Sequence, residues 1–313
     1  NESIVLSQFT LKEVIRQTIF SIADNDNNKL MTGELFEIEE NKLRVVSLDG
    51  HRISIRYIEM KNHYDSKKVV VPGKTLQEIS KIIPGSADED VVIYITNNHI
   101  VFEFENTTVV SRLIEGEYFK IDQMLSSDYD TKVRIHKREL LDCIDRATLL
   151  VKEGDKKPII MNITDGNMEL RINSFIGSMN EDIDIDKDGK DIMIGFNPKF
   201  FIDALRVIDE EEVNLYMVNP KAPCFIKDDE GKFIYLILPV NFNKQISIRE
   251  QDEFIKLGQA LKKANLVSSG VEAKIVIQDG QVTVNGETEL QRGKKLHDGD
   301  VFSYDGETVK VVK

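Results

Sequence analysis

Hydrophobic positions along the chain predict one order of helices and strands twice, with an offset of about 125 residues. Residues 9–23 place apolar side chains at helical spacing, and residues 135–151 repeat that spacing. Segments of alternating and β-branched residues follow each helix, at 33–60 in the first copy and at 158–185 in the second. These segments predict antiparallel strands joined by tight turns.

The parallel extends to a second helix and a second group of strands in each copy. Amphipathic helices are predicted over 69–83 and 194–208, where Asn197-Pro198 has the form of an N-cap followed by Pro in the first turn. Strand hairpins close the two copies over 91–114 and 213–240. Each copy is therefore predicted to be an α+β module of roughly 120 residues.

From Lys244 onward the repeat stops. Residues 244–251 have the pattern of a linker or an edge strand, 252–267 that of a short amphipathic helix, and 269–313 that of small strands with Asp-Gly and Asn-Gly turns. This tail has 11 basic and 11 acidic residues, whereas the preceding part has 30 basic and 43 acidic ones. We therefore predict three domains, 1–124, 125–243 and 244–313.

The charge and the composition exclude several classes of protein. A net charge of −13 argues against a protein that coats nucleic acid with its whole surface, but it permits a local basic face. No run of about 18 apolar residues predicts a membrane span, and the first residues do not have the pattern of a signal peptide. Cys143 and Cys224 lie far apart in the sequence, so we expect a reduced, cytoplasmic chain without disulfides and without contact to a membrane.

Two motifs resemble ligand-binding loops, but each lacks a residue that the loop requires. Residues 72–75 read Pro-Gly-Lys-Thr, but Lys68 stands where a phosphate-binding loop needs Gly, so we predict a helix start. Residues 184–189 begin like a calcium loop, but Gly195 stands where the bidentate Glu is required, so we predict a solvated acidic turn. The five histidines lack zinc spacing. We therefore expect no metal and no cofactor, and a scaffold in preference to an enzyme.

Basic residues recur on single faces of the four predicted helices, at spacings of four, seven or eight. Such faces, segregated in an acidic chain, could grip a nucleic-acid duplex through its phosphates without reading bases. Ordinary solvated helix faces are the alternative. The candidate DNA-binding residues are Lys12, Arg16, Lys74, Lys81, Arg138, Arg146, Lys199 and Arg206.

Residues 1–243 resemble the bacterial sliding clamp, the beta subunit of DNA polymerase III. The resemblance rests on 9–23, on Asp49-Gly-His-Arg52 after a strand, on 69–82 and 111–125, and on the closing Ile237-Leu-Pro-Val240. It implies the second and third modules of that family, with helices on one face of antiparallel sheets. It also implies a non-catalytic processivity subunit of the DNA polymerase III holoenzyme, which surrounds double-stranded DNA as a ring-shaped homo-oligomer.

The same resemblance implies a peptide-binding pocket between the two modules, used by the replicative polymerase subunit, the clamp loader and repair proteins through linear peptides. Phe119 stands where the family usually has Pro, and Gln123 where it usually has Arg, so the peptide preference is expected to differ. The implied pocket residues are Met31, Leu48, Gly50, His51, Arg52, Ile53, Phe119, Gln123, Met124, Leu236, Leu238, Pro239 and Val240. As an alternative, Ile53 and Leu236 are plain core residues.

The tail from about Gln251 resembles a different family, the small α/β S-four-like RNA-binding domain. This resemblance implies a helix-turn-helix and a following loop that present basic residues to structured RNA. The Arg-Gly-Lys-Lys run at 292–295 favours a local basic patch, whereas the neutral charge of the whole tail argues against a larger one. The implied RNA-binding residues are Lys262, Lys263, Lys274, Arg292, Lys294 and Lys295, with His297 beside them.

Two functions are weighed on these grounds. The preferred one is a sliding clamp fragment with an appended RNA-binding domain. The rival is an RNA-binding regulatory protein whose clamp-like part serves as an oligomerisation scaffold. Clamps of this family have three modules per chain and close as a dimer, whereas two modules are present here. Because the sequence starts with Asn, we expect a first module upstream of it; a ring of three chains and the absence of a ring are the alternatives.

Overall fold

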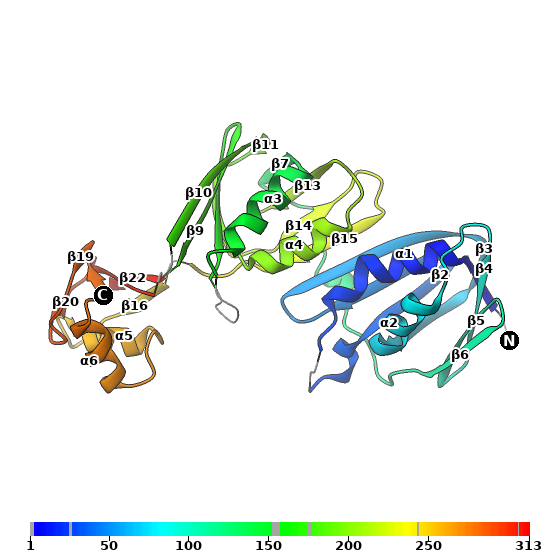
Figure 1. Ribbon diagram of the computed structural model, residues 1–313, viewed down its shortest axis with the longest axis horizontal. Coiled ribbons are helices and arrows are strands. Elements are labelled where there is room, and N and C mark those ends of the chain that lie inside the picture. The colour runs from blue at the N-terminus through cyan, green and yellow to red at the C-terminus, as the bar shows by residue number, and fades with distance from the viewer. Residues whose placement is uncertain (1–2, 25–26, 152–156, 175–176, 243, 306) are drawn as a thin grey trace.

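The computed structural model describes residues 3–24, 27–151, 157–174, 177–242, 244–305 and 307–313, and its three parts follow one another along the long axis (Figure 1). The first part consists of β1 (Ser3–Ser7), α1 (Gln8–Thr18), the 3-10 helices η1 (Ile19–Ser21) and η2 (Lys29–Thr32), β2 (Gly33–Leu48), β3 (Arg52–Pro72), α2 (Gly73–Ile82), β4 (Asp90–Ile95), β5 (His99–Phe104) and β6 (Thr107–Arg112). Helix α1 is shorter than the predicted span 9–23, because the chain tightens into η1 after Thr18.

The second part repeats this order, but five shorter strands stand between its two helices in place of the two long ones. One of the five, β11 (Asp186–Gly189), pairs with β7, so the acidic turn predicted over 184–189 is wrong for these residues. It consists of η3 (Ile121–Gln123), β7 (Thr131–His136), α3 (Lys137–Thr148), β8 (Ile159–Thr164), β9 (Asn167–Ser174), β10 (Gly177–Asp184), β11 (Asp186–Gly189), β12 (Ile192–Phe196), α4 (Pro198–Val207), β13 (Glu212–Met217), β14 (Cys224–Lys227) and β15 (Phe233–Ile237). Asn197 is the N-cap of α4, with its side chain accepting from Lys199 N, and Pro198 lies in the first turn, as predicted.

Equivalent hydrogen bonds confirm the internal repeat. The ammonium of Lys12 donates to the carbonyl of Ile83, where α2 ends, at 3.2 Å. The ammonium of Lys137 donates in the same way to the carbonyl of Ile208, where α4 ends. Because a cation is favourable at a helix C-terminus, both modules use the same contact to tie their two helices together.

The third part corrects two predictions. It consists of β16 (Lys244–Ser247), β17 (Ile255–Lys256), α5 (Leu257–Lys263), α6 (Gly270–Gln278), β18 (Val282–Val284), β19 (Glu287–Thr288), β20 (Lys295–Leu296), β21 (Val301–Tyr304) and β22 (Glu307–Val312). The helix predicted over 252–267 occupies only 257–263. The first strand-like stretch after residue 268 is the helix α6, because Ser269 caps it and Ala273, Val276 and Ile277 are buried at helical spacing.

A continuous antiparallel sheet joins the first two parts, in the order β11-β7-β13-β14-β15-β3-β2. The junction is the pair β15–β3, in which Leu236 lies opposite Ile53 and Ile237 opposite Arg52. Further sheets have the orders β1-β4-β5-β6 and β10-β9-β8-β12. The third part has its own sheet, β16-β22-β21-β18-β19, in which β16 pairs in parallel with β22.

Separate hydrophobic cores lie inside the three parts, between the helices and the sheets. A fourth cluster forms across the junction of the first two parts and includes Leu48, Ile53, Phe225 and Leu236. Since burial of such side chains is the main favourable term in folding, this cluster fixes the two modules to each other. Among the described residues, no helix has the length and apolar character needed to cross a membrane.

A fully buried carboxyl group, Glu34, lies beneath α1. The hydroxyl of Thr18 lies 2.9 and 3.2 Å from the two carboxyl oxygens of Glu34 and 2.7 Å from the carbonyl of Val14. The Thr18 hydroxyl has a single proton, so it cannot fully satisfy the Val14 carbonyl and the Glu34 carboxylate at the same time. Burial raises the pKa of Glu34 to about 8 from its ordinary value of 4.5, against the lowering effect of the Thr18 hydrogen bond.

We expect the stability of the protein to fall as the pH rises from about 5 to about 8, because Glu34 is protonated in the folded state. The folded state holds a proton on Glu34 that the unfolded state releases, so unfolding becomes more favourable by up to about 1.4 kcal/mol per pH unit in that window. Glu34→Gln keeps the shape and abolishes the titration. Urea unfolding at pH 6 and pH 8 should therefore show a smaller pH effect in this variant than in the wild type. The exposed Glu39→Gln on the same strand should behave like the wild type, and an unchanged pH effect in Glu34→Gln would refute the assignment.

Candidate functional site

An apolar groove lies on the junction of the first two modules, with a cavity of about 450 Å³. We call it the junction groove. Its walls come from η2, from the ends of β2 and β15, from the start of β3, and from the segments that follow β6 and precede β14. Its lining residues are Met31, Leu48, Gly50, Arg52, Ile53, Phe119, Met124, Pro223, Leu236 and Leu238.

The turn between β2 and β3 shapes this groove. Gly50 has a φ of +86°, a conformation that side chains rarely adopt, and it allows the chain to reverse. Asp49 fixes the turn by accepting from the backbone N–H groups of His51 at 3.0 Å and Arg52 at 3.2 Å. The backbone of Leu238 donates to the carbonyl of His51 at 2.9 Å, which holds the end of β15 against the same turn.

Nine of the thirteen pocket residues implied by the sequence line this groove. Of the other four, Gln123 lines a neighbouring cavity with Arg44 and Lys68, and Pro239 and Val240 line a separate cavity beyond Leu238. His51 stacks on Phe200 of α4, with ring centroids 6.0 Å apart. Ile53 and Leu236 are 6% and 4% exposed, and belong to the junction core as well as to the groove wall.

Sequence reasoning missed Pro223 in the groove wall. Pro223 directly precedes β14, and no motif marks it, because its place depends on the pairing of β14 with β15. Sequence reasoning also missed Asp203 on α4, whose role depends on a contact to Arg52 across the junction.

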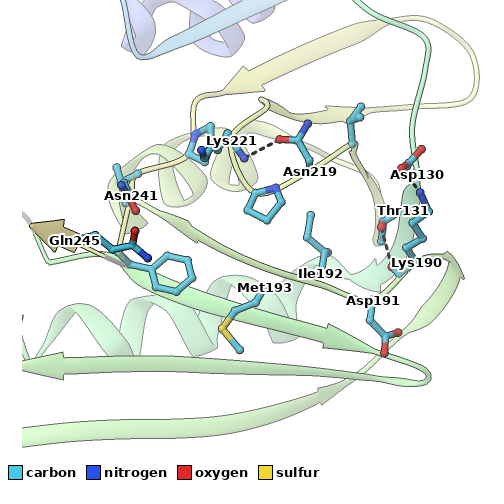
Figure 2. A pocket seen from close by; sticks show the side chains of 15 residues that line it. Asp130, Thr131, Lys190, Asp191, Ile192, Met193, Asn219, Lys221, Asn241 and Gln245 are labelled. Carbon is cyan, nitrogen blue, oxygen red and sulfur yellow. Dashed lines mark hydrogen bonds and ion pairs between the residues drawn. The ribbon is translucent and has the colours of Figure 1, made fainter. Parts of the chain in front are cut away.

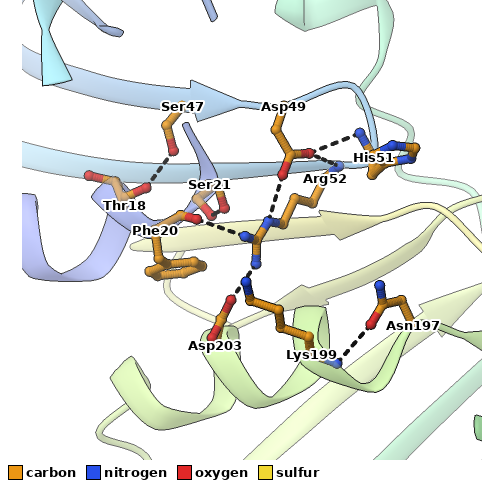
Figure 3. A network of polar contacts seen from close by, with 11 residues as sticks. Thr18, Phe20, Ser21, Ser47, Asp49, His51, Arg52, Asn197, Lys199 and Asp203 are labelled. Atoms are coloured by element: carbon orange, nitrogen blue, oxygen red, sulfur yellow. Dashed lines mark hydrogen bonds and ion pairs between the residues drawn. The ribbon is translucent and has the colours of Figure 1, made fainter. Parts of the chain in front are cut away.

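Arg52 lines the groove with its stem but directs its charge elsewhere (Figure 3). Its guanidinium lies 2.7 Å from Asp203 of α4, 2.7 Å from the carbonyl of Phe20, and 3.1 Å from Asp49. It also lies 4.5 Å from the ring centroid of Phe200. Arg52 is only 7% exposed, so it is a cross-module ion pair beneath the groove and offers little charge to a bound ligand.

The four long helices form one row across both modules. Helix α2 packs on α1, α1 contacts α4 across the junction, and α4 packs on α3. Figure 1 shows this row beside the junction of the two modules. Arg16 of α1 lies 3.5 Å from Asp209, just after α4, and so joins the two halves of the row.

Most of the candidate DNA-binding residues already form hydrogen bonds or ion pairs within the chain. Lys12 bonds the carbonyl of Ile83, as described above. Five others form ion pairs: Arg16 with Glu13 and Asp209, Lys81 with Glu78, Arg138 with Asp142, Arg146 with Glu181, and Arg206 with Asp145. Lys74 and Lys199 are exposed and have no recorded ion pair within the described residues.

Among these ion pairs, Arg146 and Glu181 are joined by two hydrogen bonds. Both nitrogens of the Arg146 fork reach the carboxylate, at 2.9 and 2.5 Å, and the Arg146 guanidinium lowers the pKa of Glu181. Glu181 lies on the edge strand β10, so this arginine braces α3 against the sheet. The other pairs are surface pairs worth about 0–1 kcal/mol, and a phosphate could replace their carboxylates.

The basic residues implied in the third domain gather mainly around α5. Arg292 lies against Gly258 at the start of α5, where an added Cβ would come within 2.8 Å of its side chain. Lys295 lies 4.4 Å from the ring centroid of Phe254, and Lys294 pairs with Glu289 at 3.5 Å. Lys262 and Lys263 end α5, whereas Lys274 lies on α6. His297 lies 3.8 Å from Asp300.

Comparison with known families divides the chain at nearly the same places as the cores. Residues 5–120 match the central domain of the DNA polymerase III beta subunit, and residues 122–241 match its C-terminal domain. Residues 246–312 match the S4 domain. The two beta-subunit matches together cover most of the chain.

Individual relatives agree with these matches. The beta sliding clamp of Staphylococcus epidermidis is 32% identical over 245 residues, which are 77% of this chain and 64% of that protein. A crystal structure of a DNA polymerase III beta subunit from Eubacterium rectale is 99% identical, with a TM-score of 0.76, over 77% of this chain and 66% of that one. The sliding clamp of Bacillus subtilis is 30% identical, with a TM-score of 0.75, over 77% and 64% of the two chains. The chain therefore spans about two thirds of the length of the clamps that it matches.

Proposed function

This chain belongs to the family of bacterial DNA polymerase III beta subunits, and we propose that its two clamp modules form part of a ring around duplex DNA. The observation that carries this proposal is the row α2-α1-α4-α3, which crosses the module junction and is backed by one continuous sheet. A row of helices with exposed lysines can follow the phosphates of a duplex without reading its bases. The proposed role is non-catalytic, since a ring keeps a polymerase on its template by tethering.

The test of this role is topological. The full chain should stay on a nicked circular plasmid during gel filtration and be lost once the plasmid is linearised. Equal retention on circular and linear DNA would count against encirclement.

We expect the double variant Lys74→Glu, Lys199→Glu to bind duplex DNA more weakly and with a smaller salt dependence. Each phosphate contact contributes about −0.9 to the slope of log K against log salt, so the slope should shrink by about 2. Fluorescence anisotropy of a labelled duplex at several salt concentrations gives both quantities. Lys42→Glu, Lys61→Glu is the matched control, because it changes the charge equally on β2 and β3. If the two double variants show equal slopes of log K against log salt, α2 and α4 do not contact DNA.

The junction groove is proposed to dock linear peptides of the replicative polymerase subunit, the clamp loader and repair proteins. It is apolar, preformed and about 450 Å³ in volume, which suits large apolar side chains of a short peptide. Phe119 and Met124 form part of its open side and would contact the peptide directly. The groove's charged neighbour, Arg52, would contribute shape and not charge.

The S4 domain supports a second activity, binding of structured RNA. What favours it is the group of Arg292, Lys294 and Lys295 beside α5, since a local basic patch can act within a neutral domain. We expect Lys294→Glu, Lys295→Glu to weaken binding of a labelled RNA hairpin about tenfold or more while retention on circular DNA is unchanged. Lys310→Glu, on the strand β22 of the same domain, together with Lys42→Glu is the control of equal charge change. Loss of DNA retention together with RNA binding would favour an RNA-binding protein whose clamp modules only assemble it.

A further inference from the structure

A second cavity, of about 1010 Å³, lies between the second module and the start of the S4 domain (Figure 2). We call it the linker cavity. Its walls come from the start of β7, from β12, from the loop between β13 and β14, and from the segment after β15. Figure 2 shows Asn241 and Gln245 at one end and Asp130 and Asp191 at the other, with Met193 and Ile192 between them.

An unpaired strand edge forms one side of this cavity. Strand β12 is the last strand of the sheet β10-β9-β8-β12 and pairs with β8 on one side only. On its other side, Val240 N donates to the carbonyl of Gly195 at 2.8 Å. In an antiparallel strand the N–H and C=O of one residue point to the same side, and successive residues alternate. The backbone groups of Met193 therefore point to the same side as those of Gly195, away from β8.

The chain after β15 begins to cover this edge and then leaves it. Val240 and Gly195 form an isolated bridge, and the next pair would join Phe242 to Met193. That pair does not form among the described residues. The ring of Phe242 instead lies against Gly195, where an added Cβ would meet its Cδ1 at 2.7 Å. The N–H and C=O of Met193 consequently have no backbone partner within the described part of the chain.

The chemistry of the cavity suits a peptide more than a nucleic acid. Its floor contains Ile192, Met193 and Phe242, which are apolar, and its rim contains side-chain amides such as those of Asn219 and Gln245. The two lysines of the lining are balanced by two aspartates, and Lys190 already pairs with Asp130 at 2.7 Å. A phosphate backbone would find no net positive charge there, whereas an extended peptide would find apolar contacts and free backbone groups.

We propose that the linker cavity binds the extended segment that flanks a docked peptide motif, and that this segment adds as a β-strand to the edge of β12 at Met193. The inference rests on the proposed peptide docking in the junction groove. Leu238 lines the junction groove, and the next residue, Pro239, lines the linker cavity. In the segment before β14, Pro223 likewise lines the junction groove and Pro220 the linker cavity. A peptide leaving the groove at this point therefore enters the linker cavity. Strand addition supplies affinity through main-chain hydrogen bonds and tolerates varied side chains.

Three synthetic peptides, one short and two long, test the proposal on the full chain. The short probe is fluorescein-labelled Ala-Leu-Ser-Leu-Phe, and the long probes carry Thr-Val-Thr-Val added at either end. We expect one long probe to bind the wild type about tenfold more tightly than the short one, as two added backbone hydrogen bonds would give.

Met193→Pro removes the outward N–H without removing a ladder bond to β8, and proline is tolerated at such edge positions. This variant should bind the long probe only about threefold more tightly than the short one, because its carbonyl can still accept one of the two hydrogen bonds. Met193→Leu keeps the N–H and should retain the tenfold difference. Amide hydrogen exchange provides a second readout, because the Met193 N–H should be protected only by the long probe.

The outcomes separate the two proposals. If neither probe binds the wild type, peptide docking in the junction groove fails, and this inference fails with it. If the short probe binds and neither extension adds affinity, or if Met193→Pro keeps the tenfold difference, only the strand addition is refuted. Protection of the Met193 amide without peptide, rising with protein concentration, would assign the edge to a second copy of the chain and likewise overturn the proposal.

Discussion

Replacing Arg52 by Met is expected to destabilise the module junction by about 2–3 kcal/mol, because the variant leaves Asp203 and Asp49 without their cation. Removal of one partner from a largely buried ion pair costs more than the pair itself contributes, since the remaining charge is left in a poorly solvated place. Asp49 and Asp203 are 17% and 21% exposed, which places the expected loss below that for a fully buried pair. Met keeps an apolar stem in the groove wall, so the change isolates the guanidinium.

Denaturant unfolding of the wild type, Arg52→Met, Asp203→Asn and the double variant gives the coupling between the two residues. Contacting charged partners typically show coupling energies of about 0.5–3 kcal/mol, and additive effects would refute a direct pairing. Spin labels at Lys61→Cys and Glu139→Cys, one in each module, should report a broader distance distribution in Arg52→Met. An unchanged distribution with unchanged stability would show that the hydrophobic junction cluster suffices alone.

Met124→Asp is expected to weaken peptide binding in the junction groove by on the order of 2–4 kcal/mol, about 30- to 1,000-fold. A bound peptide would bury the new carboxylate among apolar groups, and the Arg52 guanidinium beneath the groove is already occupied by Asp49 and Asp203. The side chain of Met124 is 42% exposed without a ligand, so the fold itself should tolerate the change. Anisotropy of the labelled pentapeptide measures the affinity directly.

Leu149→Asp is the matched control for that experiment, because Leu149 is 77% exposed and lines neither the junction groove nor the linker cavity. Met124→Leu should keep most of the affinity, since it preserves the apolar surface. Equal peptide affinity of Met124→Asp and the wild type would place the docking site elsewhere.

The effects of these two changes would also distinguish an indirect effect on peptide binding, through the module junction, from a direct effect on the bound peptide. If Arg52→Met weakens peptide binding only through a looser junction, the affinity should recover when the modules are held together by other means. If Met124→Asp acts on the peptide directly, no stabilisation of the junction will restore binding.

Sequence periodicity alone predicted the two helices of each module, the strands that follow each helix and the offset between the two copies, but not the strands β1 and β7 that precede the first helices. That was possible because amphipathic helices and alternating strands are local patterns, whose period depends only on which face is buried. The same local signals set Asn197-Pro198 at the start of α4, where the cap and the proline act within one turn. These local signals gave the wrong element in the last domain, where α6 was predicted as a strand. Its short apolar run fits the period of a helix as well as that of a strand.

Tertiary structure decided what the site residues do, because their partners come from distant parts of the chain. Arg52 and Asp203 are 151 positions apart, and no local pattern indicates that the guanidinium turns away from the groove. The sequence likewise indicated two basic residues on each of the four helices, but only the fold shows that Arg146 is held by Glu181 while Lys74 and Lys199 form no ion pair among the described residues. The open edge at Met193 depends on a bridge between Gly195 and Val240, and on the point where the chain leaves that bridge. Such features follow from strand pairing over long separations, which hydrophobic periodicity does not encode.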